Sequence, residues 1–282
     1  MPIIAKIIAR SVHTNSEIIT FELEYPRFIH SELMTHRVFS RNGASSRAIP
    51  IKKQIGYICE STAFPIAWGK NKAGMQATEL IEDPETALQV WNSARDSAIT
   101  HTEKFIELGI HKQVSNRILE PFSHMKLVLT ATEFSNWFEL RDHEDAQPEI
   151  RELAKQMINA MERTVAKKLE SNEWHVPYYN DGHWCKSCTE TLDDAIAISA
   201  SCCAQVSYRK LDDSLDKAKD IYAKLVDSKP MHASPFEHQA CPIIYPVKEW
   251  ETVPGITHMD KKKNLWSNNF KGWVQYRSLL NV

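Results

Sequence analysis

Alternation of apolar and polar positions predicts β-strands over residues 3–9, 18–25 and 125–132. In the second segment every other residue is apolar, which is the period of a strand with one buried face. Pro26 is expected to end that strand, because proline lacks the N–H that pairing requires. The alternating apolar positions of this strand are Ile19, Phe21, Leu23 and Tyr25.

Apolar residues at helical spacing predict three helices. The first begins after Asp83, a good N-cap, with Pro84 at the first helical position, and Gly109 can end it. The second is expected over 148–170 and the third near 212–226. Their apolar faces consist of Leu88, Trp91, Ala94, Ala98 and Phe105; of Ile150, Leu153, Met157, Met161, Val165 and Leu169; and of Leu215, Ala218, Ile221, Tyr222 and Leu225.

Two segments show no periodic spacing of apolar residues. Residues 35–50 are rich in Ser, Arg, Asn and Gly and are interpreted as a loop that either stays in solvent or wraps a ligand. Residues 171–190 are rich in aromatics and interrupt the helical pattern. They are the best candidate for a boundary within what is otherwise interpreted as a single domain, 1–282.

Composition and charge exclude several classes of protein. The 282 residues are 43% apolar and 25% charged, which is typical of a globular chain. A net charge of −2 gives no basic surplus of the kind that marks a general nucleic-acid binder. No apolar stretch approaches the roughly 18 residues of a membrane helix, and the first residues lack signal-peptide features. We therefore expect a cytoplasmic protein whose six cysteines are reduced thiols.

Glycine placement excludes two nucleotide-binding motifs. No two glycines are separated by one residue, so the dinucleotide fingerprint GxGxxG is absent. Gly69 and Gly74 have the spacing of a phosphate-binding P-loop, but Met75 and Gln76 follow where Lys and Ser or Thr are needed. Any nucleotide must be bound by a different kind of site.

The densest polar cluster extends from Thr35 to Arg47 and contains three arginines, a histidine and three serines. Guanidinium groups bind phosphate in a bidentate manner, and hydroxyls with loop amides can complete an anion site. A solvated basic loop is the alternative interpretation. Arg117 and Arg141, each taken alone, are more typical of surface or salt-bridge residues.

Two further clusters are open to structural interpretations. Within His232–His238, Ser234 could be the N-cap of a helix, with Pro235 at the first helical position and Glu237 at the third, which is a capping-box arrangement. Cys185 and Cys188 could begin a zinc site, but the second pair would have to be Cys202 and Cys203, which are badly spaced. Those two cysteines are expected to be small buried apolar residues.

Taken together, these segments resemble the flavin-dependent thymidylate synthases, the ThyX family. The family signature is R-H-R-x-x-S-x-N-E-x-S-x-R-Y. Thr35 replaces its first Arg, Gly43 its Glu and Ala48 its final Tyr. The positions that match are His36, Arg37, Ser40, Asn42, Ser45 and Arg47.

Other blocks of that family match in a different order along the chain. Arg117 precedes a Pro, Asn136–Arg141 and Ala146–Ile150 match one pair of blocks, and Ala204–Tyr208 and His232–His238 match another. In the family the last two precede the arginine signature. We therefore expect a circular permutation, broken between the helix near His238 and the strand over 18–25. Residues 51–116 and 242–282 have no counterpart, and 270–277 are expected to cover the site or an interface.

The resemblance implies an α+β fold with a mixed sheet and long helices. It implies methylation of dUMP to dTMP with FAD, NADPH and methylenetetrahydrofolate, without a metal. A homotetramer with shared active sites is implied, with small molecules rather than nucleic-acid polymers or membranes as partners.

The resemblance also implies roles for individual residues. Arg141 and Ser45 would be catalytic. The implied substrate-binding residues are Glu32, Gly43, Ala44, Ser45, Arg47, Arg117 and Arg141, and the implied flavin-binding residues are Thr35, His36, Arg37, Asn136, His232 and Ser234.

The departures from the signature leave alternatives open. One is a flavin-dependent pyrimidine-nucleotide hydroxymethylase, acting on dUMP or dCMP. The others are a non-catalytic flavin- or nucleotide-binding relative and a zinc-assisted binding module that uses Cys185 and Cys188.

Overall fold

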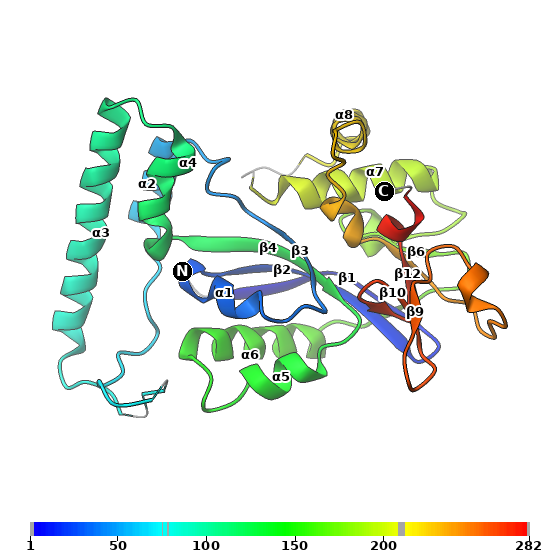
Figure 1. Cartoon of the computed structure of the whole chain (residues 1–282), viewed down its shortest axis with the longest axis horizontal. Helices are drawn as coiled ribbons and strands as arrows, with labels where there is room; N and C mark the ends of the chain where they lie inside the picture. The colour runs from blue at the N-terminus through cyan, green and yellow to red at the C-terminus, as the bar shows by residue number, and fades with distance from the viewer. Residues whose placement is uncertain (1–2, 75, 78, 208–211, 281–282) are drawn as a thin grey trace.

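A mixed five-stranded sheet forms the centre of the computed structural model, which describes residues 3–74, 76–77, 79–207 and 212–280 (Figure 1). The strand order is β3-β4-β2-β1-β5, and every neighbouring pair is antiparallel except β1 and β5. The three predicted strands and the mixed sheet are confirmed. The strands are β1 (Ile4–His13), β2 (Ser16–Pro26), β3 (Ser40–Gly43), β4 (His124–Ala131) and β5 (Lys167–Lys168).

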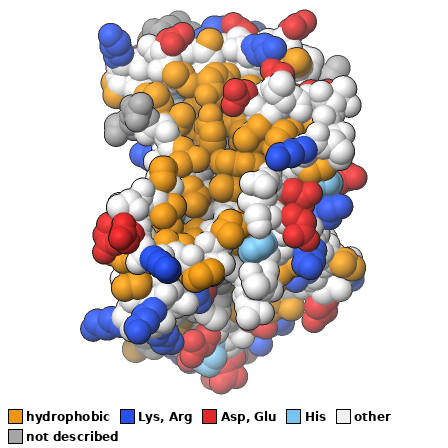
Figure 2. Space-filling view, turned by 90° about the vertical axis from the view of Figure 1, so that its right-hand side faces the viewer, with side chains coloured by type: hydrophobic (Ala, Val, Ile, Leu, Met, Phe, Trp, Pro, Cys, Tyr) orange, Lys and Arg blue, Asp and Glu red, His pale blue; other side chains and the backbone are white. Residues whose placement is uncertain are grey.

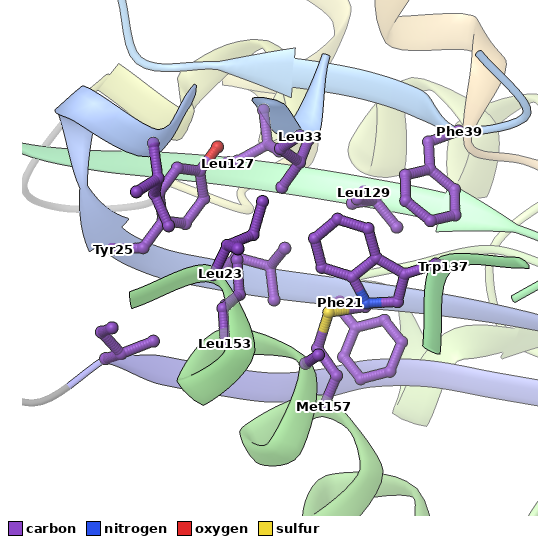
Figure 3. Close-up of a cluster of buried hydrophobic side chains, with 14 of the residues drawn as sticks. Phe21, Leu23, Tyr25, Leu33, Phe39, Leu127, Leu129, Trp137, Leu153 and Met157 are labelled. Carbon is purple, nitrogen blue, oxygen red and sulfur yellow. The ribbon is translucent and has the colours of Figure 1, made fainter. Parts of the chain in front are cut away.

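The main core lies between this sheet and two helices, α5 (Ser135–Arg141) and α6 (Pro148–Glu162) (Figure 3). The alternating apolar residues of β2 all point into it, as the strand period predicts. Trp137 of α5 is 1% exposed and packs there with Met157 of α6. The labelled core residues are Phe21, Leu23, Tyr25, Leu33, Phe39, Leu127, Leu129, Trp137, Leu153 and Met157.

The opposite face of β2 is also covered, although its alternation is typical of a strand with one face in solvent. Thr20 is completely buried, and Glu22 accepts a 2.9 Å hydrogen bond from the Tyr178 hydroxyl. Helix α7 (Leu192–Ala204) was not predicted. Its residues 195–203 are all buried, so it shows no amphipathic period. Helix α8 (Leu215–Val226) packs beside α7. Its residue range agrees closely with that of the third predicted helix, near 212–226.

The expectation of one helix over 148–170 is wrong at its C-terminal end. Helix α6 stops at Glu162, and Val165 is 93% exposed. The chain then leaves the helix so that β5 can pair with Ser11 and Val12 of β1. Leu169 is buried in a different cluster, with Ile18 of β2. The helical spacing of apolar residues therefore extends beyond the end of the helix, into residues whose structure is determined by pairing with β1.

Residues 51–122 form a helical extension beside the sheet: α2 (Ile51–Glu60), α3 (Pro84–Glu107), α4 (Lys112–Ser115) and the 3₁₀ helix η2 (Asn116–Phe122). The predicted start of α3 is confirmed, because the Asp83 carboxylate accepts from the backbone N–H of Thr86. Gly109 lies just beyond its end with φ of +71°. Within the described ranges, no helix is both long and apolar enough to cross a membrane.

Two small sheets follow in the C-terminal part. One has the order β12-β8-β6-β7 and the other β11-β10-β9. Residues 171–190 are thus a structured connection that contributes β6 and β7. The strands are β6 (Trp174–His175), β7 (His183–Trp184), β8 (Ala240–Pro242), β9 (His258–Met259), β10 (Leu265–Ser267), β11 (Phe270–Lys271) and β12 (Trp273–Gln275).

A broad apolar area crosses the face of the molecule that carries this C-terminal part (Figure 2). Ile244 and Tyr245 of the C-terminal part are 45% and 51% exposed. A groove of about 590 Å³ beside them is lined by Pro246, Val247 and Val253, among others. Contiguous apolar surface of this kind is typical of a contact face.

Candidate functional site

The segment 35–50 is not a simple loop. Its middle forms strand β3, which pairs with β4 at the edge of the sheet. Sequence reasoning missed this strand because its four residues, Ser-Arg-Asn-Gly, carry no apolar alternation. Pairing with β4 makes this part of the segment rigid, because the hydrogen bonds between the strands fix Arg41 and Asn42 relative to the core.

A pocket of about 390 Å³ lies where this segment meets α5. Five residues expected at the site line it together, namely Thr35, His36, Arg37, Asn136 and Arg141. The other lining residues are Val38, Glu133, Ser135, Leu140 and Trp266. Residues 35–38 and 133–141, about 100 residues apart in the sequence, thus form one cavity together with Trp266.

Arg141 is held in this pocket by three neighbours. Its Nε donates to Nε2 of His36 at 3.0 Å, and its terminal nitrogens lie 3.5 Å from Glu32 Oε2 and 3.3 Å from Thr35 Oγ1. Burial, followed by the charges of Arg141 and Arg41, lowers the pKa of His36 below its usual value. His36 is therefore neutral at pH 7, and its Nε2 lone pair accepts from the guanidinium.

A second cluster lies beyond the C-terminal end of β3, around Glu120, where Ser46 of the signature segment meets Arg27 and Arg117. That carboxylate accepts from Ser46 Oγ at 2.6 Å and pairs with Arg117 at 2.9 Å and Arg27 at 3.2 Å. A Cβ at Gly43 would lie 2.3 Å from Cε of Met125, so the glycine permits close packing there. Ala44 is buried and Ser45 half-buried, whereas Arg47 is exposed to solvent.

A row of polar groups lies between the two clusters. Arg41 donates to the carbonyls of Met34 and His36, beside the first cluster. Burial lowers the pKa of His30, and the charges of Arg27 and Arg41 lower it further. The Tyr25 hydroxyl contacts His30 Nδ1 at 2.8 Å. His30 senses the charges of Arg41 and of Glu120, so this row of polar groups connects the two clusters.

The His232–His238 segment lies against the signature, but differently from expectation. Residues Ser234–Glu237 form one 3₁₀ turn, η5, and Ser234 makes no side-chain cap, so the predicted capping box is wrong. His238 is completely buried, with Nε2 3.2 Å from the Asn42 side chain. His232 and Ser234 are exposed and are not among the residues that line the pocket.

Four of the six cysteines form two pairs. Cys202 and Cys203 are completely buried, as predicted, and burial raises the pKa of Cys202 to about 12. The sulfurs of Cys185 and Cys188 lie 3.7 Å apart. Across the described ranges, no cluster of three or more His, Cys, Asp or Glu side chains suits a metal.

Trp266 is the pocket residue that lies outside every segment that sequence reasoning placed at the site. It belongs to the C-terminal part, which had no counterpart in the family pattern. Its position depends on tertiary contacts: Lys271 pairs with Glu133 at 2.7 Å, and Asn269 donates to the Val38 carbonyl at 2.9 Å. Contacts between residues so far apart in the sequence cannot be predicted from a local pattern.

Replacing Trp266 with alanine is expected to weaken binding of an aromatic ligand in this pocket about fivefold, because a stacking contact contributes about 1 kcal/mol. The indole is held by a 3.1 Å bond to Asp260 and by stacking on His258. Titration of each variant with FAD, followed by fluorescence, measures the effect. Trp266→Phe, which keeps an aromatic face, is the matched control, and equal affinity of Trp266→Ala and wild type would contradict this role.

Comparison with known proteins identifies the family. A family model described as thymidylate synthase complementing protein, Thy1, matches residues 3–165. The chain is 28% identical over 145 residues to a flavin-dependent thymidylate synthase of Aquifex aeolicus, covering 51% of this chain and 45% of the relative. It is 29% identical over 140 residues to one of Thermosipho melanesiensis, covering 49% of this chain and 59% of the relative.

The aligned part thus spans about half the length of these curated relatives. Among solved structures, a UMP/dUMP methylase, PolB, from Streptomyces cacaoi is similar, with 21% identity and a TM-score of 0.44 over 51% of this chain and 66% of that one. The match to the family model covers more than half of the chain and includes both the arginine signature and Arg141. The chain therefore belongs to the Thy1 family of thymidylate synthase complementing proteins.

Proposed function

We propose that this protein is a flavin-dependent methylase of a pyrimidine nucleotide, which converts dUMP to dTMP with methylenetetrahydrofolate and NADPH. The observation that carries the proposal is the position of Arg141. Its guanidinium lies in the wall of a pocket together with Thr35, His36, Arg37 and Asn136. The names of the curated relatives, flavin-dependent thymidylate synthases, support the same activity.

The pocket residues fit a flavin cofactor. The exposed Arg37 and Asn136 supply a cation and an amide, which suit the phosphates and polar ring edge of FAD. A volume of about 390 Å³ lies within the usual range of ligand sites, although it is at the small end for a dinucleotide. When bound, the flavin would supply the redox chemistry, and the protein's task is to orient and polarise.

Arg141 would polarise the base. Uracil C5 is a weak nucleophile, and a fixed cation at a ring carbonyl lowers the free energy of the electron-rich state that precedes carbon–carbon bond formation. His36 holds the guanidinium from behind through its neutral Nε2. Because three protein groups already position Arg141, little reorganisation is needed when charge develops.

The second cluster would bind the nucleotide phosphate. Ser45 and Arg47, with the backbone near Gly43 and Ala44, would form the anion site, and Arg117 would contact the same nucleotide. The rigid attachment of Gly43 to β4 supports this role. Glu120 already neutralises part of the charge of Arg117, so Arg47 provides the more available cation.

Two departures from the family signature meet at one side chain. Thr35 stands where the signature has Arg, and its hydroxyl lies 3.3 Å from Arg141. Glu32 stands where the family has Gln, and its carboxylate lies 3.5 Å from Arg141. An arginine at position 35 would repel Arg141, whereas threonine and glutamate both hold it. The two changes therefore act in the same direction, because each makes the surroundings of Arg141 more negative.

Permutation and assembly form part of the proposal. The contact between His238 and Asn42 supports a permuted order, because it joins a late block of the chain to the early signature. A homotetramer with shared sites would bury apolar surface, and the exposed apolar face of Figure 2 supports contact with further subunits.

Product analysis tests this function. Purified protein is incubated with dUMP, methylenetetrahydrofolate, NADPH and FAD, and the nucleotide is identified by mass spectrometry. We expect dUMP to gain a methyl group, and Arg47→Ala to reduce turnover mainly through a higher KM for dUMP. A hydroxymethyl product, or unchanged dUMP with a reactive dCMP, would contradict the proposal and favour a related reaction.

A further inference from the structure

A buried chain of hydrogen bonds crosses the face of the main sheet behind the site. It starts at Ser11 of β1 and passes through His175, Thr20 and Thr130 to His238. Each of these four contacts is 2.7–2.8 Å long. All five side chains are at most 1% exposed. None of them is among the residues that line the pocket.

The far end of the chain is the side-chain amide of Asn42, in β3. The amide faces the carbonyl oxygens of Ser234 at 3.0 Å and Arg41 at 3.1 Å, and Nε2 of His238 at 3.2 Å. Carbonyl oxygens only accept, so the Asn42 nitrogen must face them. Nε2 of His238 therefore carries no hydrogen and accepts as well.

This arrangement determines which atom is the donor in each hydrogen bond of the buried chain. Nδ1–H of His238 donates to Thr130, Thr130 donates to Thr20, and Thr20 donates to Nε2 of His175. Nδ1–H of His175 then donates to Ser11. Each threonine hydroxyl accepts one bond and donates one, so both histidines are neutral and in the same tautomer.

We propose that His238 is a positioning residue: the buried chain holds it in the Nδ1–H tautomer, and it thereby fixes the Asn42 amide so that β3 and the turn Ser234–Glu237 form one rigid unit beside the pocket. This inference rests on the proposed function for the identity of the ligands. A second buried amide acts at the same junction, because Gln275 donates to Ser40 Oγ at 3.1 Å and to the Glu237 carbonyl at 3.2 Å.

The tautomer is a direct readout that does not depend on activity. We expect ¹⁵N NMR of the labelled protein to show His238 with a protonated Nδ1 and an unprotonated Nε2. Thr130→Val, which keeps the shape but removes the acceptor, is expected to shift the Nδ1 resonance. Protonation at Nε2 in the wild type would overturn the proposal.

Two substitutions separate positioning from core filling. His238→Gln places an amide near the Nε2 position and keeps an acceptor for Asn42. His238→Asn places one near Nδ1, keeps the partner of Thr130 and loses Asn42. We expect His238→Asn to weaken FAD or dUMP binding at least tenfold while His238→Gln stays within about threefold of wild type.

Equal binding losses in both variants, at equal thermal stability, would overturn the positioning role. If the substitutions prevent folding, Asn42→Asp gives the same test at a less buried residue, because its carboxylate repels the Ser234 carbonyl and should also weaken binding at least tenfold. Unchanged affinity of Asn42→Asp would likewise overturn it. Wild-type protein that binds neither FAD nor dUMP would instead refute the proposed function, while the tautomer measurement still decides the role of His238.

Discussion

Replacement of Arg141 by alanine is expected to lower kcat by a factor of about 10² to 10³, the usual cost of removing a group that stabilises transition-state charge. Flavin affinity should change little, because Arg37 and Asn136 remain in the pocket wall. The rate is measured as dTMP formed under saturating dUMP and folate. Loss of bound FAD with the substitution would show that Arg141 holds the cofactor instead.

Matched variants at the same contact sharpen this test. Arg141→Lys keeps the charge but loses the fork geometry that reaches His36, Glu32 and Thr35 together, so we expect an intermediate rate. Glu32→Gln removes a neighbouring charge and keeps a hydrogen-bonding group. It should keep kcat within about tenfold of wild type, because the guanidinium retains two partners. A Glu32→Gln variant as inactive as Arg141→Ala would make Glu32 catalytic in its own right.

Acidification should destabilise the protein steeply, because two fully buried histidines must stay neutral in the folded state. Burial lowers the pKa of His175 and of His238 to about 3, while unfolded histidines titrate near 6.5. Between these values the unfolded chain binds two protons that the folded chain does not. The free energy of unfolding should therefore fall by roughly 3 kcal/mol per pH unit as the pH decreases, once the pH is well below 6.5.

Urea unfolding at a series of pH values between about 7 and 4.5 measures this slope. Carboxylates contribute to it as well, so the comparison is with His175→Gln, which removes one of the two proton sites. That variant should be less stable at neutral pH, because it disturbs a buried chain, and its stability should depend less on pH by about one proton. Identical slopes for the variant and the wild type would contradict the neutral state of His175.

The sequence predicts the local elements best where one periodic face is buried. The alternation over 18–25 and the Asp83–Pro84 helix start both appear in the structure, since each depends on neighbouring residues alone. Helix α7 is buried on all sides and so has no period to detect. The end of α6 was misplaced because pairing of Lys167 and Lys168 with β1 overrides the apolar spacing.

The candidate site shows the same division. The family resemblance, which rests on motifs within 35–47 and 136–141, grouped residues that do line one pocket. Neither the contact of Arg141 with Glu32 nor the position of Trp266 follows from spacing, because both depend on how distant segments pack. The buried threonines and histidines behind Asn42 were hidden for a related reason. Thr20 occupies the polar face of an alternating strand, which a sequence pattern assigns to solvent.

A structure of the protein with dUMP and FAD bound tests the central claim most directly. We expect a ring carbonyl of the base within hydrogen-bond distance of Arg141 and the phosphate beside Ser45 and Arg47. Nucleotide bound elsewhere, for example in the pocket of about 500 Å³ lined by Lys52, His111 and Lys112, would contradict the assignment of the site.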